Sequence, residues 1–118
     1  MGTAIFAAQA ATGADGSLID PGEHSEDVAK IGAIYSLQGA QSPLDLPSSR
    51  GAMLAAGEIN AQGGINGRRI ELVVCDAQSD PAKAGQCAED LLAGNVSALM
   101  GLSDTDMVSS AAQKAEEA

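Results

Sequence analysis

Apolar residues fall into two alternating patterns from residue 30 onward. Short apolar runs occupy residues 31–35, 70–74 and 97–100, as is typical of buried strands. Between and after these runs, apolar residues recur every three or four positions, which is the spacing of a helix that packs one face against a sheet. The pattern therefore predicts strands and helices in alternation along most of the chain.

The first helix is predicted to open at Pro47, because proline suits the first turn of a helix. Residues 36–46 before it are rich in Ser, Gln and Gly and are interpreted as a loop. Ala and Ile then recur at helical spacing on one face. The Gly- and Asn-rich stretch 60–67 stops this helix, since those residues adopt positive φ at little cost.

Two further helices follow. Asp80 is the predicted N-cap of the second and Pro81 its first residue. That helix ends at Gly94 and Asn95. The last one runs from about Asp104 to the end of the sequence, with one apolar face formed by Met107, Val108, Ala111 and Ala115.

The repeated strand-helix order predicts an α/β fold. It consists of a three-layer parallel sheet with strand order 2-1-3 and helices on its faces, joined by right-handed crossovers. Doubly wound sheets normally continue to about five strands. The third strand is therefore expected to present an unpaired edge, which is a liability in folding.

A binding site is predicted where two loops leave neighbouring strands. In an open parallel sheet, ligands bind beyond the carboxyl ends of the strands at the point where the strand order reverses. For order 2-1-3 the loops that face each other there are 36–42 and 101–106. The candidate ligand-binding residues are Ser36, Gln38, Gly39, Ser103, Asp104, Thr105 and Asp106.

The second loop opens directly onto a helix N-terminus, whose partial positive charge can hold a carboxylate. A plainer interpretation is that Ser103, Asp104 and Thr105 merely cap their own helix. The two roles can coexist, because one residue can be the N-cap while neighbouring N–H groups face a ligand.

Three charged residues lie outside this pair of loops. Arg68 and Arg69 follow a helix and precede a strand, so they belong at the opposite end of the sheet and are predicted to be solvated. Asp76 ends the second strand on the correct side but away from the switch point. We expect it to stabilise a loop rather than to contact a ligand.

Composition and charge exclude several functions. The net charge of −10 and the absence of a basic stripe argue against nucleic-acid binding. No apolar run approaches the roughly 20 residues that span a bilayer, so direct membrane insertion is not expected. Two Cys and one His are too few for a zinc cluster. With 23 Ala and two aromatics, the chain is predicted to build a thin core.

No enzyme motif is found, and no cofactor is expected. The Gly-rich sequence GGINGR follows a helix rather than a strand, and SLQGAQ lacks the spacing of a dinucleotide loop. No Ser stands in a GxSxG context. The chain is therefore predicted not to be an enzyme.

Cys75 and Cys87 could pair across the junction between strand and helix, or remain two buried thiols. The helical position of Cys87 makes the bridge possible but not compelling, and we favour the thiols.

Residues 1–28 differ from the rest and are interpreted as a disordered leader, or the remnant of an export signal, followed by a linker. Ala8-Gln9-Ala10 resembles a signal-peptidase site, but a positively charged start is missing. His24 lies in this region and is predicted to be solvated. Residues 29–118 are predicted to form the folded domain.

Three motifs carry a family resemblance: IGAIYSLQGA, GEINAQGGINGRRIEL and CDAQSDPAKA. Over about residues 30–108 the chain resembles the start of the leucine/isoleucine/valine-type periplasmic binding proteins of ABC transporters. The resemblance implies a two-lobed fold that closes on a branched-chain or other amino acid, or an amide. It also implies a periplasmic location and a membrane permease as partner of the full-length protein.

The resemblance also implies roles for particular residues. It places Ser36 and Gln38 on the rim of the cleft, and residues 103–106 in the loop that holds the ligand's α-carboxylate and ammonium. Asp104 and Asp106 stand where hydroxyls are more usual, which favours a ligand's ammonium group. Asp45 stands where relatives often have Gly or another small residue.

The resemblance covers only the first part of an N-terminal lobe, so we expect a truncated or fragment form that binds amino acids weakly or not at all by itself. An alternative is a ligand-sensing regulatory domain of the same fold, which would recognise amides or amino acids. A small doubly wound enzyme or nucleotide binder is a third hypothesis, for which no residues were found.

Overall fold

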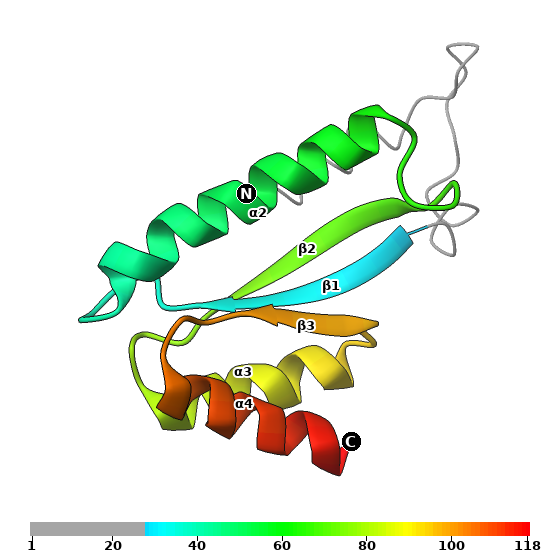
Figure 1. The fold of residues 1–118 in the computed structure, drawn as a ribbon. Coiled ribbons are helices and arrows are strands. Elements are labelled where there is room, and N and C mark those ends of the chain that lie inside the picture. The colour runs from blue at the N-terminus through cyan, green and yellow to red at the C-terminus, as the bar shows by residue number, and fades with distance from the viewer. Residues whose placement is uncertain (1–27) are drawn as a thin grey trace.

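The computed structural model describes residues 28–118, in which strands and helices alternate as predicted (Figure 1). The three strands form a parallel sheet of order β2-β1-β3, which confirms the predicted fold class and topology. Helix α2 covers one face, and α3 and α4 lie together on the other (Figure 1). The elements are β1 (Val28–Tyr35), α2 (Ser42–Ala61), β2 (Arg69–Asp76), α3 (Pro81–Ala93), β3 (Ala98–Gly101) and α4 (Thr105–Glu117).

The pairing register brings the carboxyl ends of all three strands to one edge of the sheet. Tyr35 at the end of β1 lies opposite Asp76 at the end of β2. Ile34 lies opposite Gly101, which ends β3. The loops that follow the strands therefore start from neighbouring positions.

The main core lies between the sheet and the pair α3 and α4. It is built largely from small side chains, so the helices approach the sheet closely. Its buried members are Ile34, Ala77, Ala84, Cys87, Ala88, Leu91, Met107 and Ala111. The thin, Ala-rich core predicted from composition is therefore confirmed.

Helix α2 begins at Ser42, so the prediction that it opens at Pro47 was wrong. Pro43 occupies one of the first two helical positions, where no intrahelical hydrogen bond is required of its nitrogen. Pro47 lies inside the helix, only one turn farther along, and the helix tolerates it there. The side chain of Asp45 accepts hydrogen bonds from Ser36 and Ser103, and these hold the first turn in place.

Two of the predicted helix boundaries rest on side-chain caps. Asp80 accepts a hydrogen bond from the N–H of Ala82 at 2.9 Å, and Asp104 caps α4. The predicted stop after α2 also holds, because the residues from Gly63 to Gly67 include four with positive φ. The side-chain amide of Asn60 bonds both the N–H and the C=O of Ile70, at 2.7 and 2.8 Å, and so fixes the helix end to β2.

Cys75 and Cys87 form a disulfide, so the preferred interpretation as two thiols was wrong. The turn between β2 and α3 is tight, with the N–H of Asp80 bonded to the carbonyl of Ala77. This turn folds α3 back along β2 and brings the two Cα atoms to 5.8 Å, within the ordinary range of a disulfide. The bridge links the carboxyl-terminal end of β2 to the middle of α3.

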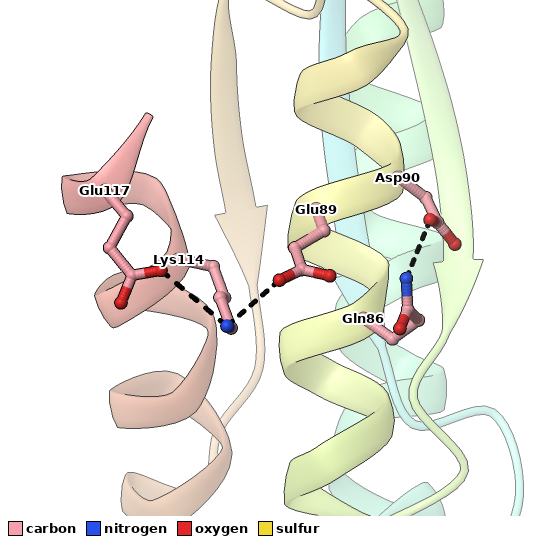
Figure 2. A network of polar contacts seen from close by, with 5 residues as sticks. All are labelled: Gln86, Glu89, Asp90, Lys114 and Glu117. Atoms are coloured by element: carbon pink, nitrogen blue, oxygen red, sulfur yellow. Dashed lines mark hydrogen bonds and ion pairs between the residues drawn. The ribbon is translucent and has the colours of Figure 1, made fainter.

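Helices α3 and α4 are also joined at the surface through Lys114 (Figure 2). Its ammonium lies 3.0 Å from a carboxylate oxygen of Glu89 on α3 and 3.6 Å from Glu117 on α4. These contacts raise the pKa of Lys114, the hydrogen bond with Glu89 most of all. The pair is exposed, so it contributes less than the core to holding the helices together.

Strand β3 has four residues and, within residues 28–118, pairs with β1 alone. The predicted unpaired edge is therefore present in the described part of the chain. Beside it runs an apolar groove of about 240 Å³ between β3 and α4, whose walls include Leu99, Met100 and Val108. Among residues 28–118, no helix combines the length and the hydropathy needed to cross a bilayer.

Strand β1 starts at Val28, one residue before the predicted domain boundary. The predicted leader, its signal-peptidase-like sequence and His24 lie outside the described residues. The division into leader and domain stays a prediction.

Candidate functional site

The loops after β1 and β3 lie side by side, as the strand order predicted. The side-chain amide of Gln41 donates to Oδ2 of Asp104 at 3.1 Å. The hydroxyl of Ser103 donates to Oδ1 of Asp45 at 2.5 Å. Residues 36–42, the first turn of α2 and residues 101–106 therefore form one continuous surface at the carboxyl edge of the sheet.

Ser36 is buried under this surface rather than exposed on it. Its hydroxyl accepts a hydrogen bond from the N–H of Ser79 at 3.0 Å and points at the sulfur of Met107, 3.7 Å away. Its own N–H donates to Asp45. Ser36 thus links both faces of the sheet in this structure, and its predicted contact with a ligand stays a prediction.

Asp76 holds the first loop, which confirms its predicted role. Its carboxylate accepts hydrogen bonds from the N–H of Leu37 at 2.9 Å, the side-chain amide of Gln38 at 2.8 Å and the N–H of Gln78 at 2.9 Å. Burial opposes ionisation of Asp76, but these hydrogen bonds and the charge of Lys83 outweigh it and lower the pKa. Asp76 therefore stabilises the fold above its ordinary pKa of 3.8, and this contribution is lost as the pH falls through the lowered value.

Ser79, which was not predicted to belong to the site, fixes the backbone around Gln38 and Gly39. The Ser79 hydroxyl donates to the carbonyl of Gln38 at 2.8 Å and accepts from the N–H of Gln41 at 2.9 Å. Gly39 has a φ of +88°, and a Cβ there would lie 2.7 Å from the Ser79 hydroxyl. Only glycine fits this close approach without strain.

The second loop is both a cap and a candidate contact surface. Asp104 Oδ1 accepts hydrogen bonds from the N–H groups of Asp106 and Met107, at 3.0 and 3.3 Å, which confirms the capping interpretation for Asp104. The hydroxyl of Ser103 bonds Asp45 instead. The cap does not use the N–H of Thr105, and both Thr105 and the Asp106 side chain are exposed. The helix end therefore keeps a donor and two polar side chains for other contacts.

A pocket of about 260 Å³ lies between α2 and the second loop. The α2 side of this pocket was not predicted, because residues 36–46 were interpreted as loop. The departure of Asp45 from the family pattern was the signal that pointed to this wall. The lining residues are Tyr35, Asp45, Ser48, Gly101, Leu102 and Ser103.

Polar groups distinguish this pocket from the groove beside α4. The groove is walled by Ile, Leu, Met, Val and Ala side chains and has no charged or hydroxyl-bearing residue in its lining. A site for a small polar solute needs a few placed polar groups to fix its orientation. The pocket at the ends of β1 and β3 has them, and the groove does not.

Tyr35 reports on the electrostatics of this pocket. Burial raises the pKa of Tyr35 above 10.0, and the nearby negative charge of Asp45 raises it further. In the folded chain the phenol therefore stays neutral at a pH where it ionises in the unfolded chain. Its contribution to stability is complete below pH 10.0 and is lost as the pH rises from 10.0 through the raised pKa.

We expect D45N to lower the pKa of Tyr35 while leaving it above the value in the unfolded chain, because burial is the larger cause. Tyr35 is the one tyrosine of the sequence, which has no tryptophan, so tyrosinate absorbance follows this residue alone. The pH titration of tyrosinate absorbance is recorded for D45N and for wild type, each in the folded state and unfolded in urea. Identical midpoints for D45N and wild type would show that the charge of Asp45 does not reach the pocket.

The two arginines lie at the far end of the sheet, as predicted. The guanidinium of Arg68 donates to the carbonyl of Val28, at the start of β1, at 3.0 Å. Arg69 is the first residue of β2, opposite Val28. Neither contributes to the surface around the two loops.

Residues 28–118 contain no cluster of three or more His, Cys, Asp or Glu side chains arranged to hold a metal ion. The carboxylates of Asp45, Asp76 and Asp104 instead accept hydrogen bonds from N–H and hydroxyl groups. The arrangement can bind a small solute through hydrogen bonds.

Comparison with known proteins identifies the family. The family model described as periplasmic binding protein matches residues 28–118. The chain belongs to this family. A Leu/Ile/Val-binding protein homolog from Brucella suis is 33% identical over 87 residues, covering 74% of this chain and 22% of the relative. The chain thus spans about a fifth of the length of such relatives.

Solved structures of periplasmic binding proteins agree with this assignment. The branched-chain amino acid binding protein LivJ from Streptococcus pneumoniae, in complex with isoleucine, has a TM-score of 0.74 and 33% identity over 76% of this chain and 26% of its own. A fatty acid ABC transporter substrate-binding protein from Thermomonospora curvata has a TM-score of 0.70 and 36% identity over 91% of this chain and 27% of its own. The described residues therefore correspond to part of one lobe of a type I periplasmic-binding-protein fold.

Proposed function

We propose that this chain is part of an extracytoplasmic solute-binding protein of an ABC transporter, with a periplasmic location and a membrane permease as the partner of the complete protein. The family match and the similarity to binding proteins for branched-chain amino acids support this proposal. The observation that carries it is the meeting of the loops after β1 and β3 through the contacts Gln41–Asp104 and Asp45–Ser103.

The proposed ligand is an amino acid with an aliphatic side chain. Its carboxylate would bind near Ser103 and Thr105, at the N-terminus of α4, where the helix dipole favours negative charge. Its ammonium would lie toward Asp106 and the pocket wall that contains Asp45. Gln38 and Gly39 would border the ligand from the first loop.

A fatty acid is the second candidate ligand, because the Thermomonospora protein is a fatty acid transporter component by name. The acidic character of the pocket favours the amino acid. Asp45 and Asp104 lie within or beside it, and a ligand whose one polar group is a carboxylate would be repelled by them.

Ligand-observed NMR with calorimetry tests the proposal on the purified chain. We expect isoleucine and leucine to bind with a dissociation constant of about 1 mM or weaker, because the described residues enclose a ligand from one side. The T105A variant should weaken binding further, since it alters the loop at the helix end. Arg68→Gln, at the opposite end of the sheet, is the control and should leave binding unchanged.

The ligand panel adds glutamate, a short amide and a medium-chain fatty acid. Binding of the fatty acid but not of isoleucine would replace the proposed ligand by the second candidate. Binding that Arg68→Gln abolishes and T105A leaves intact would contradict the proposed site. Micromolar affinity of a monomer would contradict the expectation that this chain holds part of a site.

A further inference from the structure

Asp45 is a charged residue with no exposed surface, located between the two loops of the candidate site. It belongs to the first turn of α2, and both of its carboxylate oxygens accept hydrogen bonds. Oδ2 accepts a hydrogen bond from the N–H of Ser36 at 2.7 Å, and Oδ1 accepts one from the hydroxyl of Ser103 at 2.5 Å. One side chain thus joins α2, the end of β1 and the loop after β3.

Burying a carboxylate costs free energy unless its oxygens are hydrogen-bonded. These two contacts therefore allow the side chain of Asp45 to lie in the interior. Within residues 28–118, no Lys or Arg forms an ion pair with Asp45. Its place in the fold therefore depends on a hydroxyl and a backbone N–H. Loss of either partner would leave a buried acceptor without a donor.

In the loop after β3, Leu102 packs against the core and Asp104 caps α4. Few contacts tie this loop to the end of β1 and the start of α2. Strand β3 has four residues, and the chain leaves it through Gly101 and Leu102, which have φ values of +123° and +60°. Beyond Leu102, two side-chain hydrogen bonds join this loop to residues 36–45. They are Gln41–Asp104, which is part-buried, and Asp45–Ser103. The second contact is anchored in a fully buried group and is the firmer of the two.

We propose that Asp45 is a positioning residue, which fixes the loop 101–106 against the end of β1 so that Ser103 and Thr105 are held in place for a ligand. This inference rests on the proposed function for its purpose, but the restraint itself is a property of the free chain. Asp45 acts through Ser103 and does not itself need to touch the ligand.

Amide hydrogen exchange measures the restraint without any ligand. In D45A we expect exchange within residues 103–107 to rise by about tenfold or more at the N–H groups of Asp106 and Met107, which are hydrogen-bonded to Asp104, because the loop opens locally. In D45N we expect a much smaller rise, since the amide oxygen can accept from Ser36 and the NH₂ group can donate to the Ser103 hydroxyl. Rescue by this near-isosteric change separates positioning of the loop from a need for charge.

Two further variants keep the test decisive if D45A does not fold. S103A removes the same contact from the loop side and should raise exchange in the same segment. Ser49→Ala is the matched control, because Ser49 is a buried polar residue of the same helix that bonds the carbonyl of Leu46 and does not contact the loop. It should leave exchange at residues 103–107 unchanged.

The double variant D45A/S103A should loosen the loop no more than the stronger single variant, because both remove one interaction. Additive effects would overturn the inference. So would unchanged loop exchange in S103A, a rise spread evenly over the sheet, or D45N as loose as D45A. Isoleucine titration is interpreted separately: shift changes located away from residues 36–42 and 101–106 contradict the proposed site, while the exchange data still decide the role of Asp45.

Discussion

Replacing Gly101 by alanine is expected to lower the free energy of unfolding by about 3 kcal/mol or more. Gly101 has a φ of +123°, where side chains are rarely accommodated, and a Cβ would lie 1.9 Å from the carbonyl oxygen of Ile34. Ile34 is also the residue that pairs with Gly101 in the sheet. The methyl group would therefore force the end of β3 away from β1, at the place where the candidate site begins.

The matched control for G101A is Gly67→Ala. Gly67 has a φ of +76°, but no atom lies within 4 Å of the Cβ that alanine would add. Its cost should be confined to backbone strain, about 1 kcal/mol. Urea unfolding followed by circular dichroism compares the two. A G101A variant as stable as G67A would show that β3 can leave β1 without cost.

Removal of the Cys75–Cys87 disulfide is expected to cost about 3 kcal/mol, the usual value for a loop of this length. The effect matters because the core is thin and Ala-rich, so the cross-link is a large share of the stability. Cys75 also directly precedes Asp76, which holds the loop after β1. Loosening the bridge should therefore increase amide exchange at Leu37 as well.

Urea unfolding is measured for the wild type and for C75A/C87A, each with and without reductant. The double variant should resemble the reduced wild type and should not respond to reductant. Equal stability of the oxidised and reduced wild type would contradict a structural role for the bridge. A response of the double variant to reductant would show that the reagent acts elsewhere.

The layout of the sheet could be predicted because it depends on local pattern. Three apolar runs and the boundaries at Asp80, Gly94 and Asp104 are features of short segments. The order β2-β1-β3 is one of the arrangements that right-handed crossovers allow, with α2 and α3 on opposite faces of the sheet. The adjacency of the loops after β1 and β3 follows in turn from that order.

What could not be predicted depends on contacts between distant residues. Helix α2 starts at Ser42, and in its first turn Asp45 accepts hydrogen bonds from Ser36 and Ser103, partners that no local pattern reveals. The disulfide required the tight turn at residues 77–80, which sets how α3 folds back on β2. For the same reason Tyr35 and Ser48 were missed as pocket residues.

We propose that the carboxyl edge of β1 and β3 is the solute-contacting face of this lobe. It is tested most directly by two-dimensional NMR of the labelled chain during titration with isoleucine, which detects weak binding and locates it. We expect the changes in amide chemical shift to be concentrated in residues 36–42 and 101–106. Changes concentrated at residues 63–69, or in the groove between β3 and α4, would contradict it.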